Sequence, residues 1–259
     1  MTKSKVYFFL IAFFAFANAR GQLGDSSTEE SDQMDSKYFA YGVTTNTHSG
    51  ILGGLVFRSS TPINTDRKLP VHRYIALEAV NLKHPKESTS SNPALGAKFI
   101  FGKTNYFFVV RPEYGREWYF FKKNGDSSIG LSGILAVGPS IGIQKPYYIK
   151  YGRDAGEAAI LTQYDPDIHT DYNSIRGSSS IWQGFLNNSK INPGIHIKAA
   201  TSIDMSTFGD NITGFELGTT LELFTREPEI ISPKLSTNAK AYATAYLTLY
   251  FGNKRLIKK

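Results

Sequence analysis

The chain has 259 residues, no cysteine and a formal net charge of +7. The lack of cysteine excludes a disulfide framework and a lipid-anchored cysteine at an export cleavage site, and for an exported chain it favours a bacterial route. The charge is mild and no lysine- or arginine-rich run resembles a nucleic-acid site, so we expect no nucleic-acid partner.

The N-terminus has the features of a secretory signal peptide. Two lysines precede an unbroken apolar run over residues 6–17, and an A-x-A cleavage pattern ends at Ala19. The apolar run is shorter than the ~20 residues that a membrane-spanning helix needs, which argues against an uncleaved anchor. We predict a signal peptide over residues 1–21, cleaved after Ala19 or after Gly21.

The segments that flank the central part of the chain have no apolar pattern. Residues 22–36 are polar and acidic, which predicts a disordered linker. Residues 253–259 are basic, which predicts a solvated tail.

From residue 37 onward, apolar and polar side chains alternate with a period of two. No stretch of useful length has the 3.6-residue period of an amphipathic helix, so we predict an all-β fold. Turn residues divide the alternating part into ten predicted strands. These strands cover residues 37–46, 49–59, 71–83, 92–102, 105–113, 116–123, 128–144, 191–204, 211–225 and 239–251.

The strand count depends on whether the chain reverses at Tyr114-Gly115. The aromatic and apolar residues on both sides of this point share one parity, which also suits a single long strand. An even number keeps both termini on one side of a membrane, so ten strands, our prediction, and eight are the alternatives. The residues of common parity are Tyr106, Phe108, Val110, Pro112, Tyr114, Trp118 and Phe120.

The last predicted strand has the clearest alternation. Every second residue from Ala241 to Phe251 is Ala, Leu or Phe, and every residue between them, from Tyr242 to Tyr250, is Tyr or Thr. We predict that the first set faces lipid and the second faces a lumen. We also expect this strand to close a barrel by pairing with residues 37–46 and to carry the signal for barrel insertion.

The composition of the polar face distinguishes a membrane barrel from a soluble one. In residues 130–144, 191–204 and 211–224 this face is rich in Gly, Ser and other small residues, whereas a solvated exterior is rich in Lys and Glu. Small residues suit a narrow lumen, and the Leu, Ile, Val and Phe of the other face suit lipid. We therefore predict an antiparallel, transmembrane up-and-down β-barrel over residues 37–252 in the outer membrane of a Gram-negative cell. A soluble secreted barrel is the alternative.

Two further features fit a barrel that spans a membrane. Residues 146–190 break the alternation and are mostly polar, which predicts a long extracellular loop. Tyrosines and tryptophans near strand ends are expected to form interfacial aromatic girdles. These residues are Tyr38, Tyr41, Tyr74, Tyr106, Tyr114, Trp118 and Tyr148.

Several sequence blocks resemble a family of small exported barrel proteins that is widespread in Bacteroidota. The blocks lie at residues 44–46, 52–54, 81–87 (Asn-Leu-Lys-His-Pro-Lys-Glu), 111–117 (Arg-Pro-Glu-Tyr-Gly-Arg-Glu), 137–140 and 164–166. The resemblance spans most of residues 37–252. It implies only an outer-membrane barrel and provides no known catalytic residues to transfer to this sequence. Some barrels of that phylum are accessory parts of outer-membrane assembly or protein-export machines, which the resemblance makes a possible role here.

Nine charged residues have the parity of the lumen. Because they carry both signs in similar numbers, we expect them to form ion pairs that plug a closed barrel; a charge-lined selective pore is the alternative. The nine residues are Arg58, Glu78, Lys98, Arg111, Glu113, Glu117, Lys198, Glu216 and Glu222.

The long loop contains a possible cation site. Asp165, Asp167, His169 and Asp171 place oxygen or imidazole ligands at every second position, as in part of a calcium loop. No glycine occupies the turn position, and Arg176 stands where a bidentate glutamate is expected. A solvated loop without a cofactor is the favoured interpretation, and a structural divalent cation is the alternative.

No catalytic motif emerges from the sequence. His196 shares a strand face with Ser202 and Asp204, but these lie roughly 20 Å or more along the strand, too far for a triad. We predict a non-enzymatic, porin-like outer-membrane barrel that contacts lipid and acts as a structural or accessory subunit of an envelope or export complex. A small passive channel is the first alternative and a lipid-modifying enzyme the second.

Overall fold

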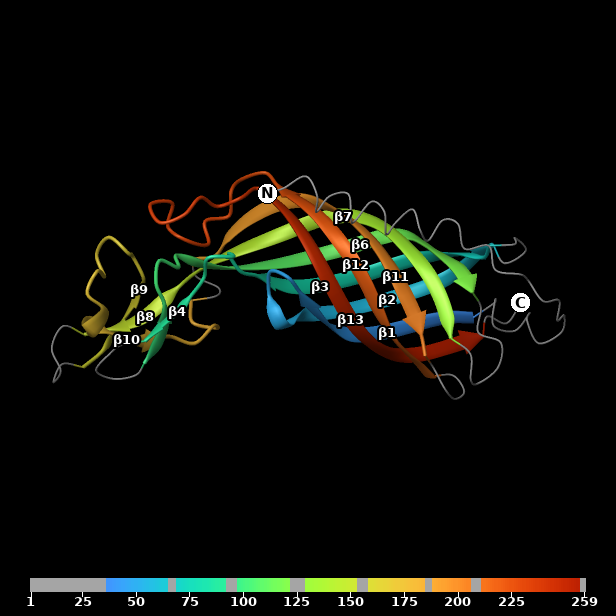
Figure 1. Ribbon diagram of the computed structural model, residues 1–259, viewed down its shortest axis with the longest axis horizontal. Coiled ribbons are helices and arrows are strands. Elements are labelled where there is room, and N and C mark those ends of the chain that lie inside the picture. The colour runs from blue at the N-terminus through green and yellow to red at the C-terminus, as the bar shows by residue number, and fades with distance from the viewer. Residues whose placement is uncertain are drawn as a thin grey trace, which may run out of the picture.

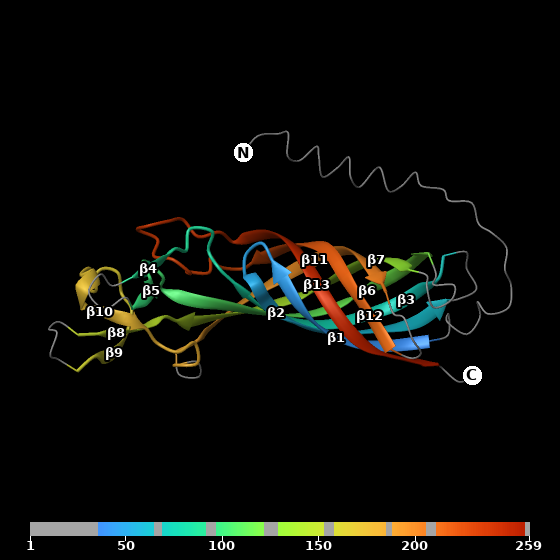
Figure 2. The same cartoon turned by 60° about the horizontal axis from the view of Figure 1, so that its bottom comes forward.

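The structure is a computed structural model that describes residues 36–64, 69–91, 97–121, 129–152, 158–184, 188–205 and 211–256. Eight antiparallel strands form a closed barrel in the order β1-β13-β12-β11-β7-β6-β3-β2 (Figures 1 and 2). Each strand pairs with the next barrel strand along the chain, which makes an up-and-down barrel. The strands are β1 (Ser36–Asn46), β2 (Gly50–Asn64), β3 (Val71–Leu82), β6 (Asn105–Phe121), β7 (Gly130–Pro146), β11 (Lys190–Asp204), β12 (Asn211–Phe224) and β13 (Ala241–Leu256).

The barrel closes between its first and last strands, as the sequence predicts. β1 and β13 pair without a register shift from Ser36–Leu256 to Asn46–Tyr246. The inward residues of β13, from Tyr242 to Tyr250, are buried, whereas Leu249 and Phe251 are about half exposed. The assignment of the two faces of this strand is confirmed.

The barrel has eight strands, so the preference for ten is wrong and the alternative of eight is correct. Residues 105–121 form one strand, β6, with no reversal at Tyr114-Gly115. Gly115 permits this continuity because a Cβ there would lie 2.1 Å from the carbonyl oxygen of Leu135 on β7. The predicted strand over residues 92–102 also differs: its described part contains only the short β5 (Lys98–Ile100), which lies outside the barrel.

The other strands extend the molecule beyond one end of the barrel (Figure 1). β4 (Thr89–Ser91) pairs with β5, and β8 (Tyr148–Tyr151) lies between β9 (Ile160–Gln163) and β10 (Ile175–Ser178). A 3₁₀ turn, η1 (Tyr172–Ser174), precedes β10. A separate apolar core holds these pieces together; it consists of Phe99, Tyr147, Ile149, Tyr164 and Ile175. The part of the chain that the structure describes contains no helix long and apolar enough to cross a membrane.

The two ends of the barrel differ in their connections. At one end, here called the loop end, the short turn 47–49 and the three long connections 83–104, 147–189 and 225–240 join the strands. At the other, here called the turn end, lie the connections 65–70, 122–129 and 205–210 and the ends of β1 and β13 that are nearest the termini. Short turns at one end and long loops at the other are typical of outer-membrane barrels.

The exterior of the barrel is apolar and its interior is polar. Large apolar side chains on the outward rows are widely exposed, including Leu55 on β2, Leu77 on β3 and Leu217 on β12. This is the inverse of a soluble barrel, in which the apolar face points inward, and it is the arrangement of a barrel that spans a membrane. Three residues assigned to the aromatic girdles lie elsewhere: Tyr38 and Tyr74 are buried in the interior, and Tyr148 begins β8, outside the barrel.

Several predicted segments lie partly or wholly outside the described residues. The signal peptide and residues 22–35 of the predicted linker do so, whereas Ser36 already begins β1. The predicted basic tail differs from the structure, because residues 253–256 continue β13 opposite β1; residues 257–259 are not described.

Filling a glycine position in the barrel wall should destabilise the fold. A Cβ at Gly218 would lie 2.6 Å from the Ala200 Cβ and 2.7 Å from the Tyr246 hydroxyl. We expect Gly218→Val to lower the free energy of unfolding by about 1–3 kcal/mol through overpacking. Denaturant titration of the protein in lipid vesicles measures this. The neighbouring Thr219→Val, on the outward face, is the control and should change stability by no more than about 0.5 kcal/mol; equal losses in the two variants would contradict the interpretation.

Candidate functional site

The inward rows of the barrel carry a continuous polar network. Eight of the nine charged residues assigned to the lumen are buried there. The ninth, Lys98, is exposed on β5, because its parity was counted along a strand that is not part of the barrel. Three cations therefore lie among five carboxylates, and each cation contacts two of them.

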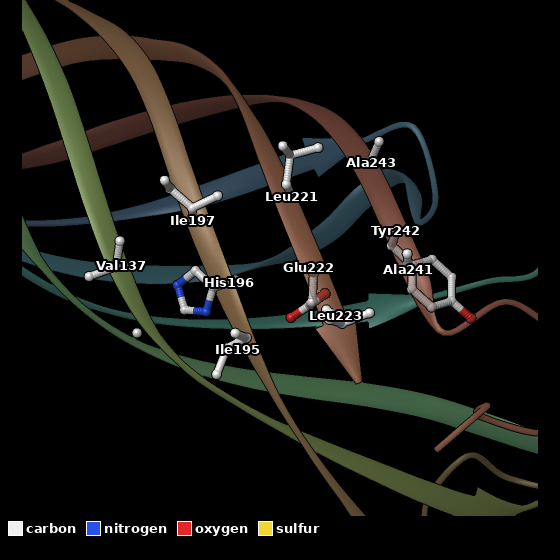
Figure 3. A pocket seen from close by; sticks show the side chains of 11 residues that line it. Val137, Ile195, His196, Ile197, Leu221, Glu222, Leu223, Ala241, Tyr242 and Ala243 are labelled. Carbon is white, nitrogen blue, oxygen red and sulfur yellow. The ribbon is translucent and has the colours of Figure 1, made fainter. Parts of the chain in front are cut away.

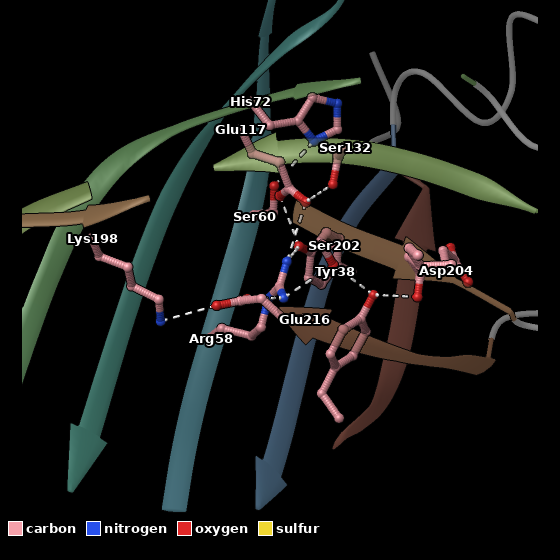
Figure 4. Close-up of polar contacts among 12 residues, drawn as sticks. Tyr38, Arg58, Ser60, His72, Glu117, Ser132, Lys198, Ser202, Asp204 and Glu216 are labelled. Carbon is pink, nitrogen blue, oxygen red and sulfur yellow. Dashed lines mark hydrogen bonds and ion pairs between the residues drawn. The ribbon is translucent and has the colours of Figure 1, made fainter. Parts of the chain in front are cut away.

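Arg58 is the centre of the network near the turn end (Figure 4). Its guanidinium lies 2.6 Å from Glu216 Oε2 and 3.1 Å from Glu117 Oε1. Tyr38 accepts a hydrogen bond from the same guanidinium and donates one to Glu117 at 2.7 Å, and Ser132 donates to Glu117 at 2.8 Å. These partners come from strands around the barrel wall, so the network links strands that do not pair with one another.

Aromatic rings surround the Arg58 guanidinium on its remaining sides. Its Cζ lies 4.5 Å from the centre of the Tyr250 ring and 5.3 Å from the rings of both Tyr38 and Tyr74. Cation–π attraction is strongest where water is excluded, so the rings add to the ion pairs. Sequence reasoning placed Tyr250 inward but missed Tyr38 and Tyr74. Their even numbers on β1 and β3, shared with Ala40 and Glu78, were the signal that could have placed them.

Lys198 and Arg111 continue the network toward the loop end. Lys198 Nζ lies 3.1 Å from both Glu216 and Glu113, so Glu216 links it to Arg58. Arg111 binds Glu222 through two guanidinium nitrogens at 2.6 and 3.0 Å, and Glu78 through a third at 3.0 Å. The desolvation penalty of buried ion pairs is offset only when their geometry is good and the remaining lone pairs accept hydrogen bonds.

Apolar layers separate and cover the charged groups. Near the turn end, Tyr38, Ala40, Ile212 and Tyr250 form one buried cluster. At the loop end a larger buried cluster fills the barrel, and Ile230 from the 225–240 connection is completely buried within it. Its members are Val80, Leu82, Phe107, Val109, Phe224, Ile230 and Tyr242. The interior is thus filled along its length.

A serine, a histidine and a glutamate meet in the lumen, and the serine is not Ser202, which shares a strand face with His196. Ser140 Oγ lies 3.1 Å from His196 Nδ1 and donates a hydrogen bond to Glu222 at 2.5 Å. Ser202 instead bonds Tyr250 at 2.9 Å, and Asp204 pairs with Lys254. Ser140 and His196 are only 1% and 4% exposed, and the Ser140 proton is engaged by a carboxylate rather than by the histidine. This geometry suits a structural hydrogen-bond network rather than an activated nucleophile.

The four residues of the possible cation site do not converge. Asp165 and Asp171 use their carboxylates to accept backbone hydrogen bonds within their own turns, from Asp167 and Asn173. The Asp167 carboxylate forms an exposed ion pair with Lys234 at 2.7 Å. His169 is buried against the rings of Tyr151 and Tyr164. Among the described residues, no group of three or more acidic, histidine or cysteine side chains is arranged to hold a metal ion.

A shallow apolar furrow of about 800 Å³ crosses the outer wall toward the loop end (Figure 3). Ile197, Leu221 and Ala243 form one rung across β11, β12 and β13, and Ile195, Leu223 and Ala241 form the next. The two alanines lie at the β13 side of these rungs, where their small side chains leave the surface low. Such a hollow in a lipid-facing wall can accept an acyl chain or the apolar face of another membrane segment.

Comparisons with known proteins add little to this description. No protein-family model and no curated protein matches the sequence. Among solved structures, the chain is similar to Ail, the attachment invasion locus protein of Yersinia pestis, in complex with the heparin analogue sucrose octasulfate (11% identity, 85% of this chain and 98% of that chain, TM-score 0.35). It is also similar to Neisserial surface protein A (9% identity, 86% and 96% of the chains, TM-score 0.32). Structural similarities this distant say nothing about the function of this chain, and the fold assignment rests on the strand pairing of the barrel itself.

Removing the central cation should destabilise the barrel strongly. Arg58→Met leaves Glu117 and Glu216 with fewer partners in a dry interior, and we expect a loss of about 3–5 kcal/mol in the free energy of unfolding. Denaturant titration in vesicles is the measurement, and the exposed Lys98→Met is the control, with a change of no more than about 0.5 kcal/mol. Similar values for the two variants would show that the network contributes little.

Chelation should leave the stability of the protein unchanged. Because the carboxylates of residues 165–171 are engaged by separate partners, we expect the same thermal midpoint with and without EDTA, followed by circular dichroism in detergent. A midpoint that falls with EDTA and recovers when Ca²⁺ is added would establish a cation site in this loop.

Proposed function

We propose that this protein is a closed, non-enzymatic β-barrel of the bacterial outer membrane that serves as a structural or accessory subunit of an envelope assembly. The apolar exterior supports residence in a membrane, and a barrel of this architecture is found in outer membranes. The loop end is then extracellular and the turn end periplasmic. Membership of the small exported barrel family suggested by the sequence blocks remains a prediction.

The filled interior is the observation that carries the proposal against a channel. Along the described strands, the lumen holds mutually paired charges, and a buried apolar cluster that includes Ile230 lies at the loop end. Eight strands leave an interior only wide enough for side chains. A conducting path would have to break ion pairs that hold the wall together, which disfavours passive diffusion.

The loop end supports a role in contacting a partner. The sheets built by β4, β5 and β8–β10 project beyond the barrel and have their own apolar core. Large apolar side chains nevertheless remain exposed there: Trp182 is 76% exposed, Ile168 69% and Ile160 65%. Large apolar side chains left exposed on the part that projects beyond the barrel support a protein-binding role.

Planar-bilayer recording tests the closed state. We expect no stable conductance steps from the purified, folded protein, because the charged network and the apolar cluster exclude a water column. Heat-modifiable migration on gels, with the same preparation, shows that the inserted protein is folded. Reproducible single-channel steps that scale with salt concentration would contradict the closed barrel and support a small passive channel instead.

A further inference from the structure

The charges on the outer wall of the barrel are all positive. On the outward rows of the eight strands, four described residues that are not buried carry a charge: Lys37, Arg73, Arg116 and Arg255. Every one lies toward the turn end. No described aspartate or glutamate shares these rows, in contrast to the interior, where acidic residues outnumber basic ones.

Arg73 and Arg116 lie directly opposite each other on β3 and β6. Arg73, the third residue of β3, is exposed, and Arg116, five residues before the end of β6, is half-buried with its guanidinium 5.9 Å from the Tyr114 ring centre. Like charges facing each other across a strand pair destabilise a sheet. Neither arginine forms an ion pair with a described acidic residue, so no described carboxylate offsets this repulsion.

The surroundings of the pair are those of a membrane interface. The outward neighbours are Ile75 and Tyr114 on the next rung toward the loop end, and Val71 and Trp118 on the next rung toward the turn end. Tyrosine and tryptophan concentrate at the interface, where a ring contacts acyl chains while its polar group reaches water. Arginines embedded in this girdle are at the depth of lipid phosphates, where an arginine on the lipid face costs least.

We propose that Arg73 and Arg116 form a binding site for the phosphate of an anionic phospholipid in the periplasmic leaflet. Two guanidinium groups on adjacent strands present several N–H donors to one anion, and guanidinium groups match phosphate geometry in a way that ammonium groups do not. A bound phosphodiester offsets the repulsion between the arginines, and its acyl chains lie along the apolar side chains toward the loop end. This site rests on the proposed residence of the barrel in an outer membrane.

A single tryptophan on the acyl-chain side of the pair reports on this site. The chain has two tryptophans; Trp118 lies one rung from the arginine pair on the turn-end side, away from the acyl chains, and Trp182 lies in the 147–189 connection at the opposite end. With both replaced by Phe, Tyr114→Trp places one tryptophan a rung toward the loop end, where brominated acyl chains in the adjacent positions quench its fluorescence. Titration of brominated phosphatidylglycerol into phosphatidylcholine vesicles then gives the preference of the site for the anionic lipid.

We expect a preference for phosphatidylglycerol of about fivefold or more, the effect of one arginine near an anionic lipid surface. Arg73→Gln combined with Arg116→Gln should abolish it. The matched control, Lys37→Gln combined with Arg255→Gln, removes a cross-strand cation pair three and four strands away from β6 and should retain it. Circular dichroism verifies that each variant is folded.

Two results would overturn the site. One is an equal response of the parent to both brominated lipids, and the other is an equal loss of preference in the two double variants, which would indicate general surface charge. A different result would refute the membrane residence instead: no quenching of the Tyr114→Trp reporter by either brominated lipid would show that β6 does not contact acyl chains. Failure of the site and failure of the proposed function are therefore distinguishable.

Discussion

The dry, narrow interior of an eight-stranded barrel is the constraint on which the rest of this structure depends. Every inward polar group must find its partner among other inward groups, because there is little room for water. The charged side chains meet this requirement by sharing: each of Arg58, Arg111 and Lys198 contacts two carboxylates, and Glu216 joins two of the cations. A few other polar atoms, such as the Tyr74 and Tyr242 hydroxyls, are buried without a hydrogen-bond partner among the described residues. Breaking one contact leaves a charge exposed to an apolar surrounding, so the network binds the wall together as a unit.

The same constraint explains why tyrosine and glycine recur on the inward rows. Tyr246 and Tyr250 on β13 pair with Gly218 and Gly214 on β12, so large rings occupy the space that the missing side chains leave. The tyrosine hydroxyls then reach the charged groups: Tyr246 donates to Glu216 at 2.5 Å. One side chain therefore fills volume, covers backbone and satisfies a carboxylate, which a leucine cannot do.

The period of two in the sequence predicted the faces of the strands, whereas the number of strands in the barrel has no comparable local pattern. Parity assigned eight charged residues and the β13 tyrosines to the interior correctly, because alternate residues of a strand point to opposite faces. The predicted number of strands was wrong because we expected a turn at Tyr114-Gly115. There the glycine instead allows close contact between β6 and β7. The prediction that Lys98 faces the lumen was wrong for a related reason, since parity assigns a residue to the lumen only if its strand belongs to the barrel. The partners of each charge, such as Glu117 with Tyr38, depend on strands far apart in the chain and have no local signal.

The contrast between the interior and the outer wall indicates where this molecule can recognise others. Inside, charges are paired and covered, so they stabilise the barrel and offer nothing to a ligand. Outside, the unpaired features lie at the two ends: exposed apolar side chains such as Trp182 at the loop end, and four cations with no acidic neighbours among the described outward residues at the turn end. These two surfaces lie at opposite ends of one barrel. If Arg73 and Arg116 are held at the depth of the lipid phosphates, the barrel has a defined height in the membrane, and the projecting sheets lie beyond its other end. Anchoring at one end and presentation at the other are then two consequences of the same closed barrel.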